Sequence, residues 1–92
     1  MIKSFKDDDT EALFRLGRVR RFVHIERPAL RKLKQLDLAR RLEDMRVPPA
    51  NRLEKLSGDR GGQWSVRIND QFRICFRWTE GGAEEVEIVD YH

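Results

Sequence analysis

Hydrophobic residues follow two different periods along this chain, and the change falls near residue 52. Before it, apolar side chains recur every three or four positions, which is the spacing of an amphipathic α-helix. After it, they alternate with polar side chains, which is the spacing of a β-strand with one buried face. Helical segments followed by a run of strands predict a single α+β domain over residues 1–92, with helices packed on one face of a sheet.

The opening of the chain predicts a short strand and a short helix. Ile2–Phe5 is the candidate strand. Asp7 and the two aspartates after it can cap a helix and place negative charge at its N-terminus, where the helix dipole favours it. We expect this helix to run from about Asp9 to Leu16, because Gly17 can adopt the left-handed conformation that ends many helices.

A second helical region begins near Pro28 and ends before Pro48 and Pro49, which cannot continue a helix. Its apolar residues form two stripes, which comprise Ala29, Leu30, Leu33 and Leu36, and then Leu38, Ala39, Leu42 and Met45. Projected on one straight helix, these stripes spread over too wide an arc to share a face. We therefore expect two short helices, or one helix with a break near Leu36 and Asp37, where Asp37 can cap the second piece.

Four short strands are predicted in the second half of the chain. Their boundaries are Leu53–Leu56, Gln63–Ile68, Phe72–Trp78 and Glu85–Val89. Turns that contain glycine separate them at residues 57–62 and 79–82. The two central strands each place aromatic and branched residues on one face, and we expect that face to pack against the helices.

The loop between the two central strands determines their register. A two-residue loop would place Val66 opposite Arg73, which sets a core position against a charge. A three-residue loop over residues 69–71 instead pairs Ile68 with Phe72 and Val66 with Ile74, so both apolar sets share one face. We therefore predict the three-residue loop.

The same register places Arg67 directly opposite Arg73 on the other face of the sheet. Like charges in that position destabilise a sheet, so a compensating interaction is expected. Either acids on the last strand, Glu85 and Glu87, balance the two guanidinium groups, or the pair binds an anion such as phosphate. Two nearby residues make this open face more cationic, namely Lys55 and Arg60.

Composition narrows the class of protein. Charged residues make up 38% of the chain and hydrophobic residues 39%, with a formal net charge of +3. That balance is typical of a globular domain with a charged surface. The net charge alone does not show that the protein binds nucleic acid. Arginine outnumbers lysine, and its planar guanidinium suits phosphate and carboxylate partners. No apolar run approaches the roughly 20 residues of a membrane span, and no secretory signal follows Met1, so we expect a cytoplasmic protein.

Neither a metal nor another cofactor is expected. Cys75 is the one cysteine, so no internal disulfide forms, and its strand position indicates a packed residue more than a reactive thiol. The two histidines, His24 and His92, cannot complete a closed zinc site with one cysteine unless carboxylates are recruited.

The last three residues, Asp90, Tyr91 and His92, bring a carboxylate, a phenol and an imidazole together. A chain end of this kind can be a frayed polar tail, but the apolar strand before it would hold these groups on the sheet. Cleavage of RNA needs one group to accept the 2′-OH proton, another to protonate the leaving 5′ oxygen, and cations to stabilise the phosphate. These residues with an arginine can supply such groups, and they can equally form a binding surface.

Two blocks of this sequence resemble the HigB (host inhibition of growth) toxins of the RelE/ParE superfamily, also called plasmid maintenance system killer proteins. They are Gly58-Asp59-Arg60 and the run Gln63–Phe76; the opening Met1–Phe5, residues 51–54 and the closing Val89–His92 fit as well. The resemblance implies a compact α+β fold with a curved, mostly antiparallel sheet and two to three short helices on one face. It implies a toxin that cleaves mRNA in the ribosomal A site without a metal.

The resemblance also implies a partner, a HigA-like antitoxin with a helix-turn-helix domain, and contact with operator DNA only through that antitoxin. Transferred by matching positions, Arg73 would stabilise the scissile phosphate, and Asp90, Tyr91 and His92 would form the catalytic cluster, with the acid and base roles left open.

Two positions depart from the family pattern, because some members carry histidine in place of Glu54 and lysine in place of Ser57. We expect Glu54 to remain a candidate base. Lys55 or Arg60 would then have to supply the missing cation, although Lys55 should point away from Glu54 if the strand is extended. Six more basic residues lie in the first half of the chain, namely Arg18, Arg20, Arg21, Arg27, Arg31 and Lys32. We expect them either to contact ribosomal RNA or to be ordinary solvent-exposed residues.

Two other functions stay open at this point. One is inhibition by binding a target such as DNA gyrase, as ParE-type relatives do. The other is a co-repressor role in which the chain tunes operator binding by its antitoxin, and this is compatible with RNA cleavage. The ending Asp90–His92 and Arg73 favour cleavage.

Overall fold

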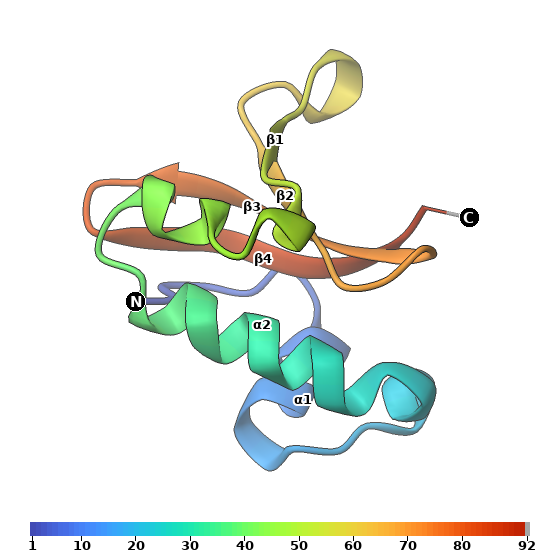
Figure 1. The fold of residues 1–92 in the computed structure, drawn as a ribbon. Helices are drawn as coiled ribbons and strands as arrows, with labels where there is room; N and C mark the ends of the chain where they lie inside the picture. Colours follow the sequence, from blue (N-terminus) through green and yellow to red (C-terminus); the bar gives the residue numbers. More distant parts are fainter. Residues whose placement is uncertain (92) are drawn as a thin grey trace.

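A computed structural model of the chain describes residues 1–91 (Figure 1). It contains two α-helices, α1 (Asp8–Leu16) and α2 (Glu26–Leu38), and four strands, β1 (Glu54–Lys55), β2 (Trp64–Arg67), β3 (Phe72–Thr79) and β4 (Gly82–Asp90). Four short 3-10 helices join them: η1 (Arg20–Ile25), η2 (Leu42–Arg46), η3 (Pro49–Asn51) and η4 (Gly58–Arg60). The strands form one antiparallel sheet in the order β1-β2-β3-β4, which confirms the predicted α+β class.

The core lies between the sheet and the two α-helices, which cover one face (Figure 1). The alternating residues of β2 and β3 point into it as predicted, and Val66, Ile74 and Phe76 are fully buried. From the helices, Leu13, Leu33 and Leu36 are equally buried. Burial of this apolar surface stabilises the fold and leaves the opposite face of the sheet to other side chains.

Helix α1 forms as its capping residues predict. The Asp7 carboxylate accepts a hydrogen bond from the Thr10 backbone N–H at 3.0 Å, and Gly17 adopts a φ of 83° where the helix ends. Thr10 is buried, and its hydroxyl accepts a hydrogen bond from the Ile88 backbone N–H at 3.1 Å. The cap therefore also ties the start of α1 to β4.

The second helical region differs from its prediction in where it breaks. Helix α2 starts at Glu26, so Pro28 lies in the first turn, where a missing N–H costs nothing. The helix runs past the predicted break to Leu38, whose side chain is 79% exposed and does not belong to an apolar stripe. Asp37 caps no helix, because its carboxylate accepts from the Ile2 backbone N–H at 2.9 Å. The second piece is the 3-10 helix η2, which buries Met45.

The opening segment is extended, as predicted, but it pairs only at isolated positions. Ile2 and Phe5 form parallel bridges to Ala83 and Val86 of β4. The Lys3 backbone N–H donates to the Ala83 carbonyl at 2.7 Å. The sheet is thus antiparallel with a short parallel edge beside β4.

The register of the central hairpin is the predicted one. Val66 pairs with Ile74 and Arg67 with Arg73, and the Ile68 N–H donates to the Phe72 carbonyl at 2.9 Å. On the other side of β3, a bulge in β4 shifts the register between Cys75 and Arg77. These two registers decide which side chains meet on the open face.

Candidate functional site

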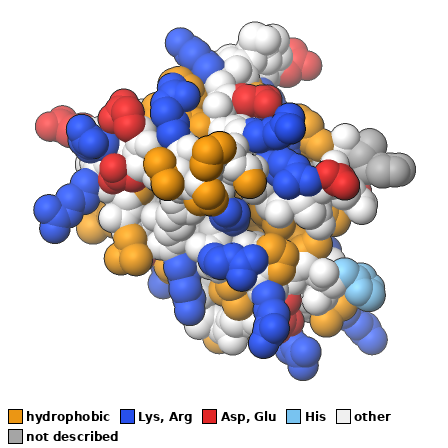
Figure 2. Space-filling model, in the orientation of Figure 1, with side chains coloured by type: hydrophobic (Ala, Val, Ile, Leu, Met, Phe, Trp, Pro, Cys, Tyr) orange, Lys and Arg blue, Asp and Glu red, His pale blue; other side chains and the backbone are white. Residues whose placement is uncertain are grey.

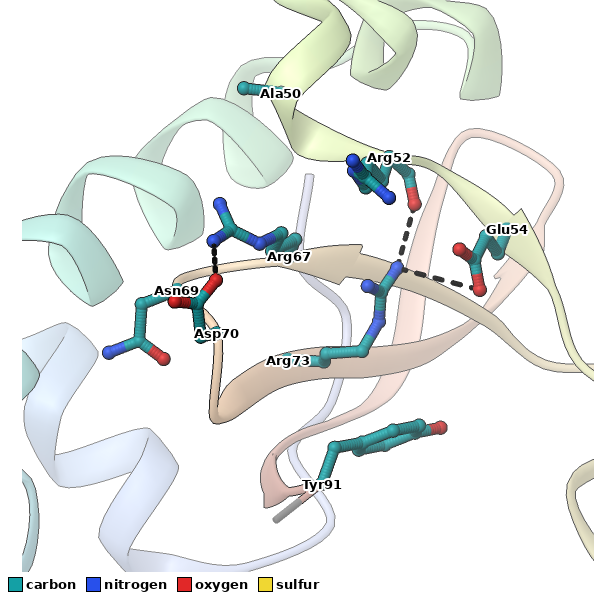
Figure 3. Close-up of a pocket in the computed structure, with 8 residues that line it drawn as sticks. All are labelled: Ala50, Arg52, Glu54, Arg67, Asn69, Asp70, Arg73 and Tyr91. Carbon is teal, nitrogen blue, oxygen red and sulfur yellow. Dashed lines mark hydrogen bonds and ion pairs between the residues drawn. The ribbon is translucent and has the colours of Figure 1, made fainter.

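The open face of the sheet contains a hollow of about 550 Å³ at the end of the β2–β3 hairpin (Figure 3). Its lining residues come from η3 and the segment after it, from β1, from the hairpin and from the end of β4: Ala50, Arg52, Glu54, Arg67, Asn69, Asp70, Arg73 and Tyr91. Four of these were predicted site residues, Glu54, Arg67, Arg73 and Tyr91. The structure brings them together from positions up to 37 residues apart, from Glu54 to Tyr91.

Arg73 is the most enclosed charge in the hollow, with a side chain only 11% exposed. Its Nε donates to the Ser65 hydroxyl at 2.8 Å, and its Nη2 donates to the Arg52 carbonyl at 2.7 Å. The Glu54 carboxylate lies 3.9 Å from the same Nη2, and the Tyr91 ring lies beneath the guanidinium carbon at 5.9 Å. Because these contacts hold the planar group on several sides, it keeps a single orientation toward the hollow.

Arg67 is held more loosely than the arginine opposite it. Its guanidinium forms an ion pair with Asp70, whose side chain is 99% exposed. The loop between them is shaped by Asn69, whose side-chain oxygen accepts from the Gln71 and Phe72 backbone N–H groups at 2.9 and 2.8 Å. An exposed ion pair of this kind is weak, so an incoming anion can compete with Asp70 for Arg67.

Acids offset the two facing arginines, but not the acids that the sequence suggested. Glu87 lies on the predicted face, opposite Cys75, and its carboxylate binds Arg60 at 2.8 Å instead of Arg73. Glu85 sits in the β4 bulge with a φ of 53° and binds Arg77 at 2.7 Å. The alternative in which these two glutamates balance the arginine pair is therefore wrong, because the strand register directs both to other cations.

Tyr91 borders the hollow where β4 ends. Its backbone N–H donates to the Gln71 carbonyl at 2.7 Å, and its hydroxyl lies 3.8 Å from the Cys75 sulfur. Desolvation is the larger cause, and the hydrogen bond with Cys75 the smaller cause, of a raised pKa of the Tyr91 phenol. The phenol is therefore protonated at neutral pH. Burial likewise raises the pKa of the Cys75 thiol, which is fully buried and fits the expected packed strand residue.

Three other predicted residues lie outside the hollow. Asp90 pairs with Phe72 across the strands, so strand alternation sends it to the face opposite Tyr91, where it accepts from the Gln71 side-chain amide at 3.1 Å. Lys55 pairs with Trp64 and points away from Glu54, as anticipated, so it does not supply the missing cation. Arg60 lies on the open face but is bound to Glu87, and that hydrogen bond raises the pKa of its guanidinium. His92 lies outside the described residues.

Arg20 and Arg21 belong to η1, on the helical side of the molecule. Arg21 forms ion pairs with Asp7 and Asp9 at 3.7 and 3.4 Å. It also lines a second hollow that shares Asn69 with the first, so the two hollows adjoin across the hairpin loop. Figure 2 shows many basic and few acidic side chains over the helical half, in the lower part of the view.

Sequence reasoning did not predict the two residues that receive hydrogen bonds from Arg73, namely Arg52 and Ser65. It also did not single out three lining residues, Ala50, Asn69 and Asp70. Arg52 follows η3 in the left-handed conformation, with a φ of 46°, and turns its carbonyl onto Arg73. Ser65 is buried opposite Cys75 and accepts from Arg73. The alternation of β2 did place Ser65 on the face of Arg67 and Arg73, which is a signal that could have found it. No periodic signal marks Arg52.

Within residues 1–91, no group of three or more histidine, cysteine, aspartate or glutamate side chains is placed to hold a metal ion. Across the same part of the chain, every helix is too short or too polar to cross a membrane.

Comparison with solved structures defines the class of fold. The chain superposes on a chain of the YoeB-YefM complex from Staphylococcus aureus with a TM-score of 0.58 and 17% identity, covering 100% of this chain and 98% of that one. At this identity the likeness concerns the fold alone, which is a compact α+β domain with helices on one face of an antiparallel sheet.

Sequence comparison then specifies the family. Residues 3–92 match the HigB-like toxin family, described as the RelE-like toxin of type II toxin-antitoxin system HigB. Toxin HigB-1 of Vibrio cholerae serotype O1 is 39% identical over 85 residues, which is 90% of each chain. Endoribonuclease HigB of Proteus vulgaris is 30% identical over 93 residues, which is 100% of each chain. This chain belongs to the HigB-like family of type II toxin–antitoxin systems, and its partner is an antitoxin.

Proposed function

We propose that this toxin is an endoribonuclease that cleaves mRNA in the ribosomal A site, without a metal, and thereby inhibits translation. The observation that carries the proposal is the pre-oriented Arg73 guanidinium, 11% exposed, at the edge of a hollow lined by further arginines. The name of the Proteus vulgaris relative, Endoribonuclease HigB, supports RNA cleavage over the alternative of inhibition by binding gyrase.

The reaction we propose is an attack of a ribose 2′ oxygen on the adjacent phosphorus. The 2′ proton passes to a base, the bond from phosphorus to the 5′ oxygen breaks, and that oxygen takes up a proton. The products carry a 2′,3′-cyclic phosphate and a 5′-hydroxyl. Negative charge develops on the phosphate oxygens during this step, and cations already aimed at it lower the barrier.

The hollow supplies candidates for each role. Arg73 is oriented to stabilise the phosphate, and Arg67 is its neighbour across the strands. The Tyr91 phenol, whose raised pKa keeps it protonated, suits the donor role at the 5′ oxygen. The Glu54 carboxylate, 3.9 Å from Arg73, is the candidate base among the described residues that line the hollow. We propose Asp90 and His92 as further members of the terminal cluster, with Asp90 reaching the substrate from the far side of the strand end.

The openness of the hollow supports the proposed dependence on the ribosome. Tyr91 is 46% exposed and the Glu54 side chain 57%, so the protein alone leaves its acid and base candidates solvated. A partner that holds the mRNA backbone in line for attack supplies the missing positioning. Basic residues over the helical half, including Arg20 and Arg21, are the proposed contacts to ribosomal RNA through counterion release.

We further propose that the antitoxin is HigA-like, with a helix-turn-helix domain, and that this toxin meets operator DNA only through it. Because ribosomes and mRNA are the proposed targets, we place the activity in the cytoplasm. Arg60 and Lys55 remain proposed secondary contacts for RNA beyond the scissile phosphate, since neither lines the hollow.

The test is cleavage of a defined mRNA on 70S ribosomes with an occupied P site, in the Mg²⁺ that ribosomes require, mapped by primer extension. The toxin is stripped of bound metal with EDTA and desalted beforehand, and free mRNA treated with EDTA is the control. We expect A-site cuts that need ribosomes, persist with the EDTA-stripped toxin and disappear in Arg73→Ala. Uncut mRNA together with gyrase inhibition would establish the binding alternative. Cuts that are lost when the toxin is stripped, and return when a transition metal is added back, would contradict the metal-independent mechanism.

A further inference from the structure

The three arginines that line the hollow differ in what already binds them (Figure 3). Arg73 donates to Ser65 and to the Arg52 carbonyl, and Arg67 pairs with Asp70. Within residues 1–91, the Arg52 guanidinium has no hydrogen bond or ion pair, although its backbone is fully engaged. A cation in a hollow with no internal partner is available to a ligand.

The backbone at Arg52 is held in a conformation that a residue other than glycine seldom adopts. Its φ is 46°, its N–H donates to the Pro49 carbonyl at 3.0 Å, and its carbonyl accepts from Arg73. Such a conformation costs free energy, so the surroundings must impose it. It directs the side chain of Arg52 to the rim of the hollow, next to Arg67 and Arg73 (Figure 3).

The surroundings that impose it are centred on Asn51, which is fully buried. The Asn51 amide nitrogen donates to Gln35 of α2 and to the Met45 and Val47 carbonyls at 3.1–3.3 Å, and its oxygen accepts from Lys32. Because every polar atom of this buried amide has a partner, the η3 turn is fixed to the helical layer. The backbone of Arg52, the next residue, is therefore held in place as well.

The charges of the hollow show why a third cation matters. Arg67 and Arg73 are matched in number by Glu54 and Asp70, so without Arg52 the formal charges of the lining cancel. With Arg52 the lining has three cations and two anions. Ser57, exposed at the start of η4, adds none. Arg52 is therefore the residue that makes the hollow net positive toward a phosphate.

We propose that Arg52 is a substrate-binding residue whose guanidinium binds a phosphate of the RNA backbone at the hollow. The proposal rests on the proposed function for its substrate, single-stranded RNA. Its carbonyl orients Arg73 and its side chain binds RNA, so the two contributions of Arg52 can be separated by mutation.

The separating variant is Arg52→Gly. Glycine adopts a positive φ without a steric cost and keeps the carbonyl that receives Arg73, while it removes the guanidinium. Arg52→Asn is a second variant, because asparagine also tolerates this conformation. Arg40→Ala is the matched control, since it removes the charge of one exposed arginine that does not line the hollow.

Binding is measured by NMR titration with a short single-stranded RNA whose 2′ oxygens are all methylated, so that it cannot be cleaved. At low salt this detects millimolar affinity through the arginine Nε–H signals. We expect signals of Arg52 and Arg73 to move in the native protein. In Arg52→Gly we expect weaker binding. The slope of log Kd against log salt concentration should be smaller by about 0.7, the value for the loss of one phosphate contact with a single strand. Arg40→Ala should bind with the native slope.

Unchanged affinity and slope in both Arg52 variants would overturn the proposal, and so would a native titration in which the Arg52 signal stays still. Cleavage on ribosomes is scored separately. If the native protein cleaves while both Arg52 variants bind RNA with native affinity and slope, the binding role of Arg52 fails and the proposed function stands. If the native protein does not cleave but Arg52 binds RNA, the proposed function fails and the binding role of Arg52 stands.

Discussion

The two faces of the sheet both bury residues, but by different means. On the face toward the helices, Val66, Ile74 and Phe76 are buried by apolar packing. On the open face, Ser65 and Cys75 are buried as completely, and there the cover includes Arg73 and the turn before β1, joined by hydrogen bonds. One face excludes water with hydrocarbon, and the other excludes it with oriented polar groups.

Because the two faces are buried by different means, substitutions on them should affect stability and activity separately. Apolar packing has no preferred direction, so its loss lowers the free energy of unfolding in proportion to the area and cavity involved. Hydrogen bonds to a guanidinium are directional, so their loss disturbs the aim of Arg73 more than the stability of the domain. A substitution on each face should therefore move a different measurement.

The largest effect is expected on the packed face. Phe76→Ala should lower the free energy of unfolding by about 3–5 kcal/mol, because it opens a cavity at a fully buried position. Chemical denaturation followed by tryptophan fluorescence measures this change. Without denaturant, where the variant is still folded, its cleavage rate on ribosomes should be close to native. A complete loss of cleavage by the folded variant would contradict the idea that the packed face contributes to stability and the open face to activity.

On the open face, Arg73→Ala should lower kcat/KM for ribosomal cleavage by about 10²–10³-fold, the usual cost of removing one oriented donor at a developing charge. Arg73→Lys should recover little, since one ammonium cannot reproduce the planar donors that reach Ser65 and the Arg52 carbonyl. Single-turnover cleavage measures both variants. Native cleavage by Arg73→Ala would remove this residue from the mechanism.

Asn51 connects the two faces, so its replacement should affect both measurements moderately. Asn51→Ala leaves the Met45 and Val47 carbonyls and Gln35 short of a donor, at a cost of about 1–3 kcal/mol in the free energy of unfolding. The turn before Arg52 then loosens, and RNA affinity should fall with it. Denaturation and the RNA titration are compared. A change in stability with native affinity would show that Asn51 serves the fold alone.

The smallest effect is a pH dependence that belongs to the helical layer. Backbone hydrogen bonds from Arg41 and then Arg40 lower the pKa of the Asp44 carboxyl in the folded state. A lowered folded pKa stabilises the fold above the unfolded value of about 3.9, and this contribution disappears as pH falls through the lower one. Asp44→Asn should flatten the acid limb of stability against pH. Glu43→Gln, one residue away, is the control, and an equal flattening there would point to a general charge effect.

The fold and part of the candidate site could be predicted from local patterns, whereas Glu54 was named only through the family resemblance. Alternation in β2 and β3 identified the core face, and the length of the hairpin loop placed Arg67 opposite Arg73. Both follow from the strand pleat, in which a side chain two positions along returns to the same face. Tyr91 was predicted from its position at the end of an apolar strand, and it does border the hollow.

The errors lie where a contact joins segments far apart in the chain. Asp37 was expected to cap a helix, but the N-terminal segment uses its carboxylate. Glu87 was one of two alternatives for offsetting Arg73, but the turn after β1 brings Arg60 to it. Each of these side chains had a plausible local partner, and a distant partner competed successfully because folding brought it closer.

The α+β class, the apolar face and the pair of facing arginines can be read from the sequence alone, since each depends on spacing within one segment or across one short loop. The position of Arg52 at the hollow depends on tertiary packing. Its carbonyl and its guanidinium reach the hollow because Asn51 is fixed to α2, across contacts 16 and 19 residues apart in the chain. No period along a sequence encodes such a contact, because it exists only after the helical layer has packed against the sheet.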